Sequence, residues 1–210
     1  MRSNDYYVFV LGSGGHTKEM LMMMDDGHID FGDVHRRYII SSGDKMSKDH
    51  VLAYEADLKA RSEAGKCRPG TYDLVTVPRA RKVHQSIWTT PFSALSSVMG
   101  ILPALLSPPE GASANTISVP SKVFSNGPAT GFFVAATIYL LKVLFMVSSS
   151  DMNFIYIESW ARVSTLSLTG KALYYTDLAD LMVVQHYQVA KTYGLTCVGP
   201  MVFNARRDVS

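Results

Sequence analysis

The most informative stretch of the sequence is YYVFVLGSGGHT, residues 6–17. Tyr6–Leu11 is a short apolar run with the length and residue types of a buried strand. The glycine-rich segment Gly12–Gly15 follows it directly, and a helical segment is expected from Thr17. A strand that turns through glycines into a helix is the repeating unit of parallel sheets, in which helices connect neighbouring strands.

The same alternation continues along the chain and predicts an α/β fold, a Rossmann-like doubly wound parallel sheet. The runs predicted as strands are Tyr6–Leu11, Arg37–Ser41, Asp73–Val77, Lys122–Ser125, Asn153–Ile157 and Leu181–Val184. The segments predicted as helices are Thr17–Met24, Lys45–Arg61, a broken Ile87–Leu106, Ala129–Val147 and a shorter piece after Ser164. Asp44 is the expected N-cap of the second helix.

Composition and charge limit the classes of protein to which the chain can belong. The 210 residues are 47% hydrophobic and 18% charged, which excludes extended disorder and favours one domain over residues 1–210. The formal net charge of +2 gives no electrostatic argument for a nucleic-acid partner. Cys67 and Cys197 lie far apart, so neither a disulfide framework nor a zinc site is expected.

We expect no membrane-spanning helix, because such a helix needs about 20 apolar residues. Ser86–Pro109 carries no formal charge but is interrupted by prolines and a glycine, and residues 131–147 contain a central lysine. Ile87–Leu106 is nevertheless rich in apolar side chains, which favours peripheral contact with a membrane surface. The side chains expected to make that contact are Trp88, Phe92, Leu95, Val98, Met99, Ile101 and Leu102.

The glycine turn after the first strand is a candidate binding site, since ligands of doubly wound folds bind beyond the carboxyl ends of strands. Its backbone can approach a ligand closely, and the amides that start the next helix favour a phosphate. The candidate substrate-binding residues are Gly12, Ser13, Gly14, Gly15 and Thr17. The segment is neither a P-loop nor a full GxGxxG, and no acidic residue ends the second strand, which disfavours a dinucleotide-dependent oxidoreductase. A tight turn that binds nothing is the alternative.

Other strand ends also carry polar residues. His16, at the start of the first helix, is a candidate base, phosphate contact or helix cap. Arg79 and Arg81 follow the third strand and suit a diphosphate or an anionic lipid headgroup, with a solvated surface loop as the alternative. Asn126 and Gly127 join the fourth strand to a helix through small residues, so we expect them to contact substrate at the same edge.

Glu158 ends the fifth predicted strand, and Arg162 follows four residues later. A carboxylate at a strand end can act as a catalytic base or bind a sugar, and Arg162 can assist in binding. The same spacing equally suits a structural ion pair between these two side chains. Both interpretations stay open.

Together these segments resemble one family: the membrane-anchoring subunit of the eukaryotic UDP-N-acetylglucosamine transferase that makes the second step of dolichol-linked oligosaccharide assembly in asparagine-linked glycosylation. The segments that carry the resemblance occur in the family's order. They are GSGGHTKEM at 12–20, PRAR at 78–81, NGP at 126–128, IYIES at 155–159 with ARV at 161–163, and LSLTGK at 166–171. The match extends from Tyr6 to about Pro200.

The resemblance implies the acceptor-binding half of a GT-B glycosyltransferase, with the UDP-GlcNAc-binding half on a separate catalytic subunit. The pair would transfer N-acetylglucosamine to GlcNAc-diphosphodolichol on the cytosolic face of the endoplasmic reticulum membrane. By this analogy Gly12–His16 faces the acceptor diphosphate with Arg79 and Arg81 as supports, and His16 or Glu158 helps to deprotonate the acceptor hydroxyl. Neither a metal nor another cofactor is implied, and the tail, residues 198–210, is expected to dock the catalytic subunit.

The sequence departs from the family pattern at its start. Many members carry an N-terminal hydrophobic anchor, whereas five residues precede the first predicted strand here. Attachment through Ile87–Leu106 and a partner, or a missing anchor segment, are the two expectations. Two other functions stay open: a self-sufficient transferase that uses a sugar nucleotide, and a pure membrane scaffold. The first is disfavoured because a GT-B active site lies between two domains of this size.

Overall fold

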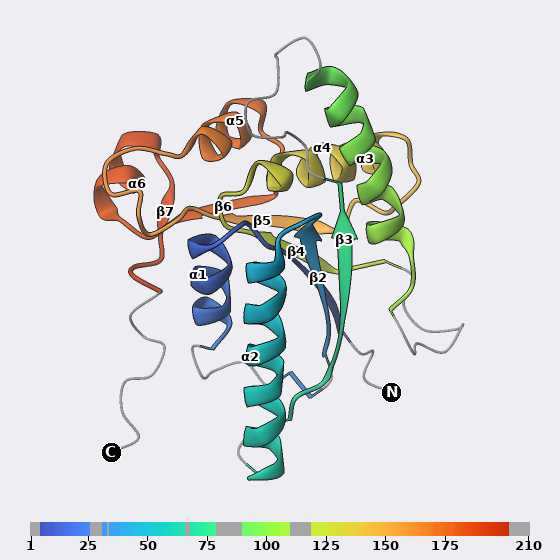
Figure 1. Ribbon diagram of the computed structural model, residues 1–210. Helices are drawn as coiled ribbons and strands as arrows, with labels where there is room; N and C mark the ends of the chain where they lie inside the picture. Colours follow the sequence, from blue (N-terminus) through green and yellow to red (C-terminus); the bar gives the residue numbers. More distant parts are fainter. Residues whose placement is uncertain are drawn as a thin grey trace.

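The computed structural model describes residues 5–25, 31–32, 34–65, 68–78, 90–109 and 119–201, and for residues 90–96 the backbone alone. The described residues form an open sheet of parallel strands with helices on both faces (Figure 1). Its strand order is β3-β2-β1-β4-β5-β6-β7. The predicted α/β, Rossmann-like doubly wound fold is therefore confirmed.

The elements alternate along the chain. The strands are β1 (Asp5–Val10), β2 (Val34–Ser41), β3 (Thr71–Val77), β4 (Lys122–Ser125), β5 (Asn153–Ile157), β6 (Leu181–Val184) and β7 (Thr196–Cys197). The helices are α1 (Gly15–Met24), α2 (Lys45–Glu63), α3 (Thr90–Leu106), α4 (Ala129–Val143), α5 (Leu168–Thr176) and α6 (Tyr187–Tyr193).

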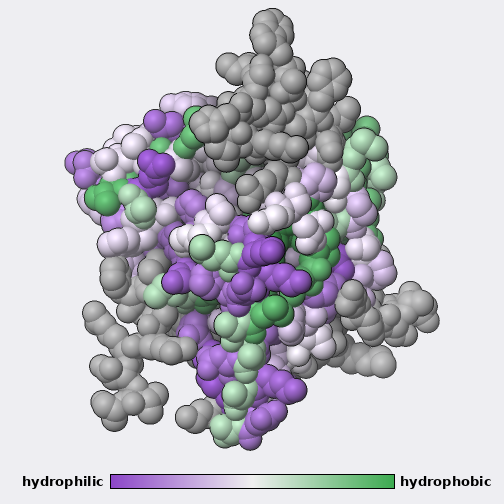
Figure 2. All heavy atoms as spheres, viewed as in Figure 1, coloured by the Kyte–Doolittle hydropathy of each residue, from purple (hydrophilic) through white to green (hydrophobic). Residues whose placement is uncertain are grey.

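Two apolar clusters hold the helices against the sheet. α1 and α2 cover one face through Met20, Leu21, Val51 and Leu58. α3, α4 and α5 cover the other face through Ile101, Leu105, Val134, Ile138 and Leu173. The outer surface of α2 is mixed: hydrophilic residues alternate with apolar ones (Figure 2), and Met46 and Leu52 are 58% and 41% exposed.

The strand order reverses at β1, which lies between β2 and β4. Val10 near the end of β1 is paired with Ile39 of β2 on one side and with Ser125 of β4 on the other. The chain leaves β1 toward a helix on one face of the sheet and leaves β4 toward a helix on the other face. The two helices therefore diverge beyond the strand ends and leave room for a ligand between them. The topology thus places the glycine turns after β1 and β4 next to each other.

Each of the six predicted strands and five predicted helices is present. α4 ends at Val143, before the predicted end at Val147, because the chain turns at Phe145, whose φ is 55°. α6 and β7 were not predicted; they are only seven and two residues long. Asp44 is the N-cap of α2, as predicted, and its carboxylate accepts a hydrogen bond of 3.0 Å from the Ser47 amide.

β2 begins at Val34, three residues before the predicted start at Arg37, and contains two buried arginines. The guanidinium of Arg36 donates two hydrogen bonds, of 3.0 and 2.7 Å, to the carboxylate of Glu55 on α2. The Tyr38 hydroxyl donates to the same carboxylate at 2.5 Å. The ion pair allows a charged residue to occupy a buried strand position and ties β2 to α2.

Arg37 joins β2 and β3 to the end of α3. Its guanidinium donates hydrogen bonds of 2.8 and 2.6 Å to the Asp73 carboxylate on β3. It also donates to the carbonyl oxygens of Ala104 and Ser107, each at 2.9 Å, and of Pro108 at 3.0 Å. These carbonyls belong to the last turn of α3 and the residues after it, so Arg37 satisfies acceptors that the helix leaves open.

α3 contains most of the segment predicted to contact a membrane, and the structure corrects part of that prediction. Ile101 is fully buried in the core and Leu102 packs against it, because α3 covers the sheet between β3 and β4. Met99, by contrast, is 66% exposed. Trp88 and the side chains of residues 90–96 lie outside the described residues. No helix in the described part of the chain combines the length and apolar composition needed to cross a bilayer.

Replacing Arg37 by methionine is expected to lower the free energy of unfolding by about 3–5 kcal/mol, because the buried Asp73 carboxylate would lose the guanidinium that pairs with it. Urea denaturation followed by circular dichroism measures the change. Lys48→Met, which removes a charge from the exposed surface of α2, is the matched control and should shift the value by less than about 0.5 kcal/mol. Equal losses for the two variants would contradict the expectation.

The same pair predicts a loss of stability in acid. Burial alone would raise the pKa of the Asp73 carboxyl, but the Arg37 hydrogen bonds and the nearby His35 outweigh burial and hold that pKa well below its usual range. The unfolded carboxyl titrates near 3.9, so the unfolded chain binds the proton first as pH falls. The free energy of unfolding should therefore fall as pH drops below about 5 and continue to fall toward the lower folded pKa.

Denaturation curves recorded between about pH 3 and pH 7 check this prediction. Asp73→Asn should be less stable at neutral pH, and its deficit relative to wild type should shrink in acid. Asp49→Asn removes a carboxylate from the exposed surface of α2 and is the control. A deficit of Asp73→Asn that stays constant with pH would overturn the assignment.

Candidate functional site

The glycine turns after β1 and β4 meet at the imidazole of His16. A Cβ on Gly127 would lie 2.8 Å from Cε1 of His16, and the φ of Gly127 is 107°. A Cβ on Gly12 would lie 2.9 Å from the Cβ of Pro128 and 3.1 Å from that of His16. Glycine is therefore required at both positions for the two turns to approach each other.

The start of α1 is open to a ligand. Gly14 is the N-cap, with φ 64°, and provides no side chain to satisfy the amides of the first turn. The first intrahelical hydrogen bond runs from the Lys18 amide to the Gly14 carbonyl at 3.4 Å. The amides before Lys18 have no acceptor within the helix. Ser13 and Gly15, at this helix start, are exposed. An anion is the natural partner for such amides.

Thr17, a predicted substrate-binding residue, is fully buried. Its hydroxyl donates to the Gly12 carbonyl and lies 2.7 Å from the hydroxyl of Ser47 at the start of α2. The Ser47 hydroxyl also lies 3.0 Å from the Gly12 carbonyl oxygen. The Thr17 side chain thus holds the glycine turn in shape, and contact between this residue and substrate stays a prediction.

Asn126 connects the second turn to the first. Its side-chain amide is fully buried and donates a hydrogen bond of 2.8 Å from Nδ2 to the backbone carbonyl of His16. Its Oδ1 is buried and has no hydrogen-bond partner among the described residues. Asn126 therefore fixes the backbone at His16, and Gly127 leaves space for the His16 ring.

Glu158, the second predicted catalytic residue, is buried, and its carboxylate is hydrogen-bonded to the loop before α5. Its carboxylate accepts hydrogen bonds from the amides of Ser159 at 3.0 Å and Ser167 at 2.9 Å, and from the Ser167 hydroxyl at 3.1 Å. A Cβ on Gly170 would lie 2.2 Å from its Oε2, so the start of α5 packs directly on this carboxylate. Together, burial and the nearby carboxylate of Glu158 raise the pKa of Tyr156 and keep its hydroxyl protonated.

Arg162 lies apart from this carboxylate. Its side chain is exposed, and within the described part of the chain it makes no ion pair with Glu158, so the structural pair that the sequence suggested is absent. Arg79 and Arg81 lie outside the described residues. A role in substrate binding stays a prediction for all three arginines.

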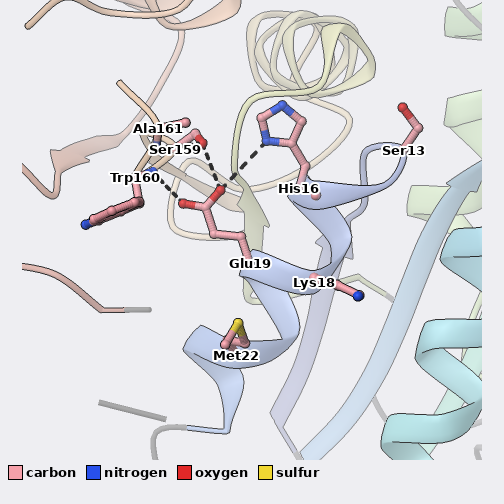
Figure 3. Close-up of a pocket in the computed structure, with 9 residues that line it drawn as sticks. Ser13, His16, Lys18, Glu19, Met22, Ser159, Trp160 and Ala161 are labelled. Atoms are coloured by element: carbon pink, nitrogen blue, oxygen red, sulfur yellow. Dashed lines mark hydrogen bonds and ion pairs between the residues drawn. The ribbon is translucent and has the colours of Figure 1, made fainter. Parts of the chain in front are cut away.

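Glu19 is the buried carboxylate of the site, and sequence reasoning did not single it out. Figure 3 shows it between His16 and the loop after β5. Its Oε1 accepts from the Trp160 amide at 2.5 Å and from Nε2 of Gln185 at 2.9 Å. Its Oε2 accepts from the Ser159 hydroxyl at 2.8 Å and lies 3.9 Å from Nδ1 of His16. The available signal was its position three residues after His16 on the same helix, which puts the two side chains on one face.

A pocket of about 520 Å³ opens between α1 and the loop after β5 (Figure 3). Trp160 in its wall is held at both backbone ends, because its amide donates to Glu19 and its carbonyl lies 2.6 Å from Nε2 of His186. The pocket combines open amides, a cation, an imidazole and an aromatic ring, a set that suits a phosphorylated sugar. Its lining residues are Ser13, Gly15, His16, Lys18, Glu19, Met22, Ser159, Trp160 and Ala161.

Comparison with known proteins places the chain in a family. The family model described as "Oligosaccharide biosynthesis protein Alg14 like" matches residues 7–199. A protein of Schizosaccharomyces pombe named UDP-N-acetylglucosamine transferase subunit alg14 is 34% identical over 182 residues, which cover 87% of this chain and 76% of that protein.

Two further relatives carry the same name. The protein from Debaryomyces hansenii is 33% identical over 92% of this chain and 74% of its own length, and the human protein is 30% identical over 88% of this chain and 76% of its own. The matched region includes both glycine turns, Glu19 and the loop after β5. The chain therefore belongs to the Alg14-like family of oligosaccharide biosynthesis proteins.

Proposed function

We propose that the chain is the acceptor-binding, non-self-sufficient subunit of a UDP-N-acetylglucosaminyltransferase. In this proposal it binds GlcNAc-diphosphodolichol and recruits a catalytic, UDP-GlcNAc-binding subunit to the cytosolic face of the endoplasmic reticulum membrane. The pair would carry out the second step of lipid-linked oligosaccharide assembly for protein N-glycosylation. The names of the relatives, each a transferase subunit, support the assignment.

One observation carries the acceptor-binding part: two uncapped helix N-termini flank the same imidazole. Gly14 before α1 and Pro128 before α4 provide no capping side chain, and Gly127 brings the second turn against the ring of His16. Each helix end can accommodate one negative group, so the pair suits the two phosphates of a diphosphate bridge. Lys18, exposed in the pocket wall, adds a cation to these amides.

His16 is the candidate base that faces the pocket, whereas the Glu158 carboxylate is committed to hydrogen bonds in its own loop. In the proposed transfer the acceptor hydroxyl gives its proton to the imidazole while its oxygen bonds to the anomeric carbon of the donor GlcNAc. The bond from that carbon to UDP breaks, and the electron pair leaves with UDP. The proposed transfer therefore needs no reactant besides the UDP-GlcNAc donor and the lipid acceptor.

The architecture supports the proposed need for a partner. A sheet of this kind supplies one wall of a glycosyltransferase cleft, and the donor nucleotide needs a second domain. The segment proposed to dock the partner, residues 198–210, begins beside the site: the amide of Met201 donates to Oε1 of Gln185 at 3.0 Å. Membrane contact is proposed for the exposed portion of Ile87–Leu106, which includes Met99.

Co-expression tests the function. Membrane fractions that contain the chain together with the catalytic subunit of the same organism are expected to transfer GlcNAc from UDP-GlcNAc to a GlcNAc-diphospholipid acceptor, and fractions with either chain alone are not. Turnover by the purified single chain would instead establish a self-sufficient transferase. Normal transfer after simultaneous replacement of Gly14, His16 and Lys18 would establish a scaffold.

Gly127→Ala tests whether the second glycine turn shapes the acceptor site. The added methyl group would overlap the His16 ring, so transfer should fall at least tenfold while the two subunits still co-purify. Gly65→Ala is the matched control, because Gly65 also has a positive φ, 71°, but its Cβ would meet no atom within 4 Å. Backbone strain of about 1–3 kcal/mol is expected in both variants, and only Gly127→Ala displaces the imidazole. Equal activity of the two would contradict the assigned role.

A further inference from the structure

We infer that Glu19 is the positioning residue of this site: its carboxylate holds His16 in the tautomer that carries hydrogen on Nδ1 and leaves Nε2 free to accept a proton. The consequence for turnover rests on the proposed function, whereas the tautomer itself is a property of the chain. The inference joins three observations, on the ring, on the carboxylate and on the loops that surround them.

The two nitrogens of the His16 ring have different surroundings. Nδ1 is buried and has no hydrogen-bond partner among the described residues, and the nearest carboxylate oxygen is Oε2 of Glu19 at 3.9 Å. The ring is packed against the backbone of Gly127, yet 37% of the His16 side chain is exposed. Figure 3 shows the second ring nitrogen turned away from Glu19. Nε2 is therefore the nitrogen that a ligand in the pocket can reach.

One oxygen of the Glu19 carboxylate, Oε2, can accept a further hydrogen bond, from Nδ1 of His16. Oε1 accepts two hydrogen bonds, whereas Oε2 accepts one, from Ser159, and retains a lone pair on the side of His16. A carboxylate can only accept, so Nδ1 must carry the hydrogen for the two groups to interact favourably. Catalytic hydrogen bonds are often long without substrate and tighten when it binds, so a separation of 3.9 Å is compatible with this contact.

The carboxylate is also held in place. Its donors come from Ser159 and Trp160 after β5 and from Gln185 after β6, while Glu19 itself lies on α1. Two segments, after β5 and after β6, thus fix the carboxylate that orients the imidazole, as a third group orients the base in many hydrolytic and transfer enzymes. A purely structural clamp would need these three bonds but would not need a free lone pair facing Nδ1.

Nitrogen-15 NMR of the imidazoles tests the tautomer directly. The full chain, labelled at histidine and bound to its catalytic partner, is observed at about pH 8, above the ordinary titration range of histidine. The His16 signals are assigned by their absence in His16→Asn. Wild type should show a protonated Nδ1 and an unprotonated Nε2. Wild type with hydrogen on Nε2 would overturn the inference.

Glu19→Gln is the decisive variant. Its amide oxygen can keep the Trp160 and Gln185 hydrogen bonds, which turns the amide NH2 toward Nδ1 and should reverse the tautomer. Ser159→Ala removes one bond of the clamp but leaves the carboxylate, so it should keep the wild-type tautomer. An unchanged tautomer in Glu19→Gln, with the protein folded by circular dichroism, would also overturn the inference.

Kinetics of the reconstituted transferase complete the test. Glu19→Gln is expected to lower kcat about 10- to 100-fold with little change in KM for the lipid acceptor, and to have no further effect when His16 is already asparagine. Equal effects of Glu19→Gln in the two backgrounds would reduce Glu19 to a structural clamp and overturn the inference. A wild-type complex that shows the expected tautomer but no transfer would instead reject the proposed function.

Discussion

The site depends on close approach between two backbone turns on opposite sides of the switch point. That approach is possible only where side chains are absent, since a Cβ on Gly12 or Gly127 would overlap the neighbouring turn. The approach places the His16 ring between the turn after β4 and the carboxylate of Glu19. It also brings Pro128, the N-cap of α4, against the turn that leads into α1. The absence of side chains at Gly12 and Gly127 therefore lets the sheet topology bring the helix starts and the imidazole together.

The second constraint is the burial of charge in β2. Arg36 and Arg37 point to opposite faces of the sheet, and each is matched by a carboxylate from the element it meets, Glu55 on α2 and Asp73 on β3. Such pairs contribute little to stability relative to apolar residues, but breaking one leaves a buried charge. Arg37 additionally binds the carbonyls that end α3. The pairs therefore fix how α2 and α3 sit against the strands that carry the site.

The sequence predicted the fold well because apolar periodicity and glycine turns are local signals. It misplaced the start of β2 because two adjacent arginines look like a solvent-exposed segment, and their carboxylate partners are 19 and 36 residues away in the chain. α6 and β7 are too short to produce a clear period. Ile101 was predicted to contact a membrane but is buried in the core. An apolar helix sequence does not reveal whether protein or lipid covers it.

The site was predicted less completely than the fold because its central carboxylate depends on contacts that no local pattern reveals. Glu158 ends a strand and therefore attracts attention, yet its hydrogen bonds serve the start of α5. Glu19 lies within a helix, and only the tertiary structure brings Trp160 and Gln185 to it across more than 140 residues of chain. Gln185 also accepts from the amide of Met201, which belongs to the proposed docking tail, residues 198–210. The Gln185 side chain therefore links the Glu19 carboxylate, which we infer positions His16, to the first described part of the segment proposed to hold the partner.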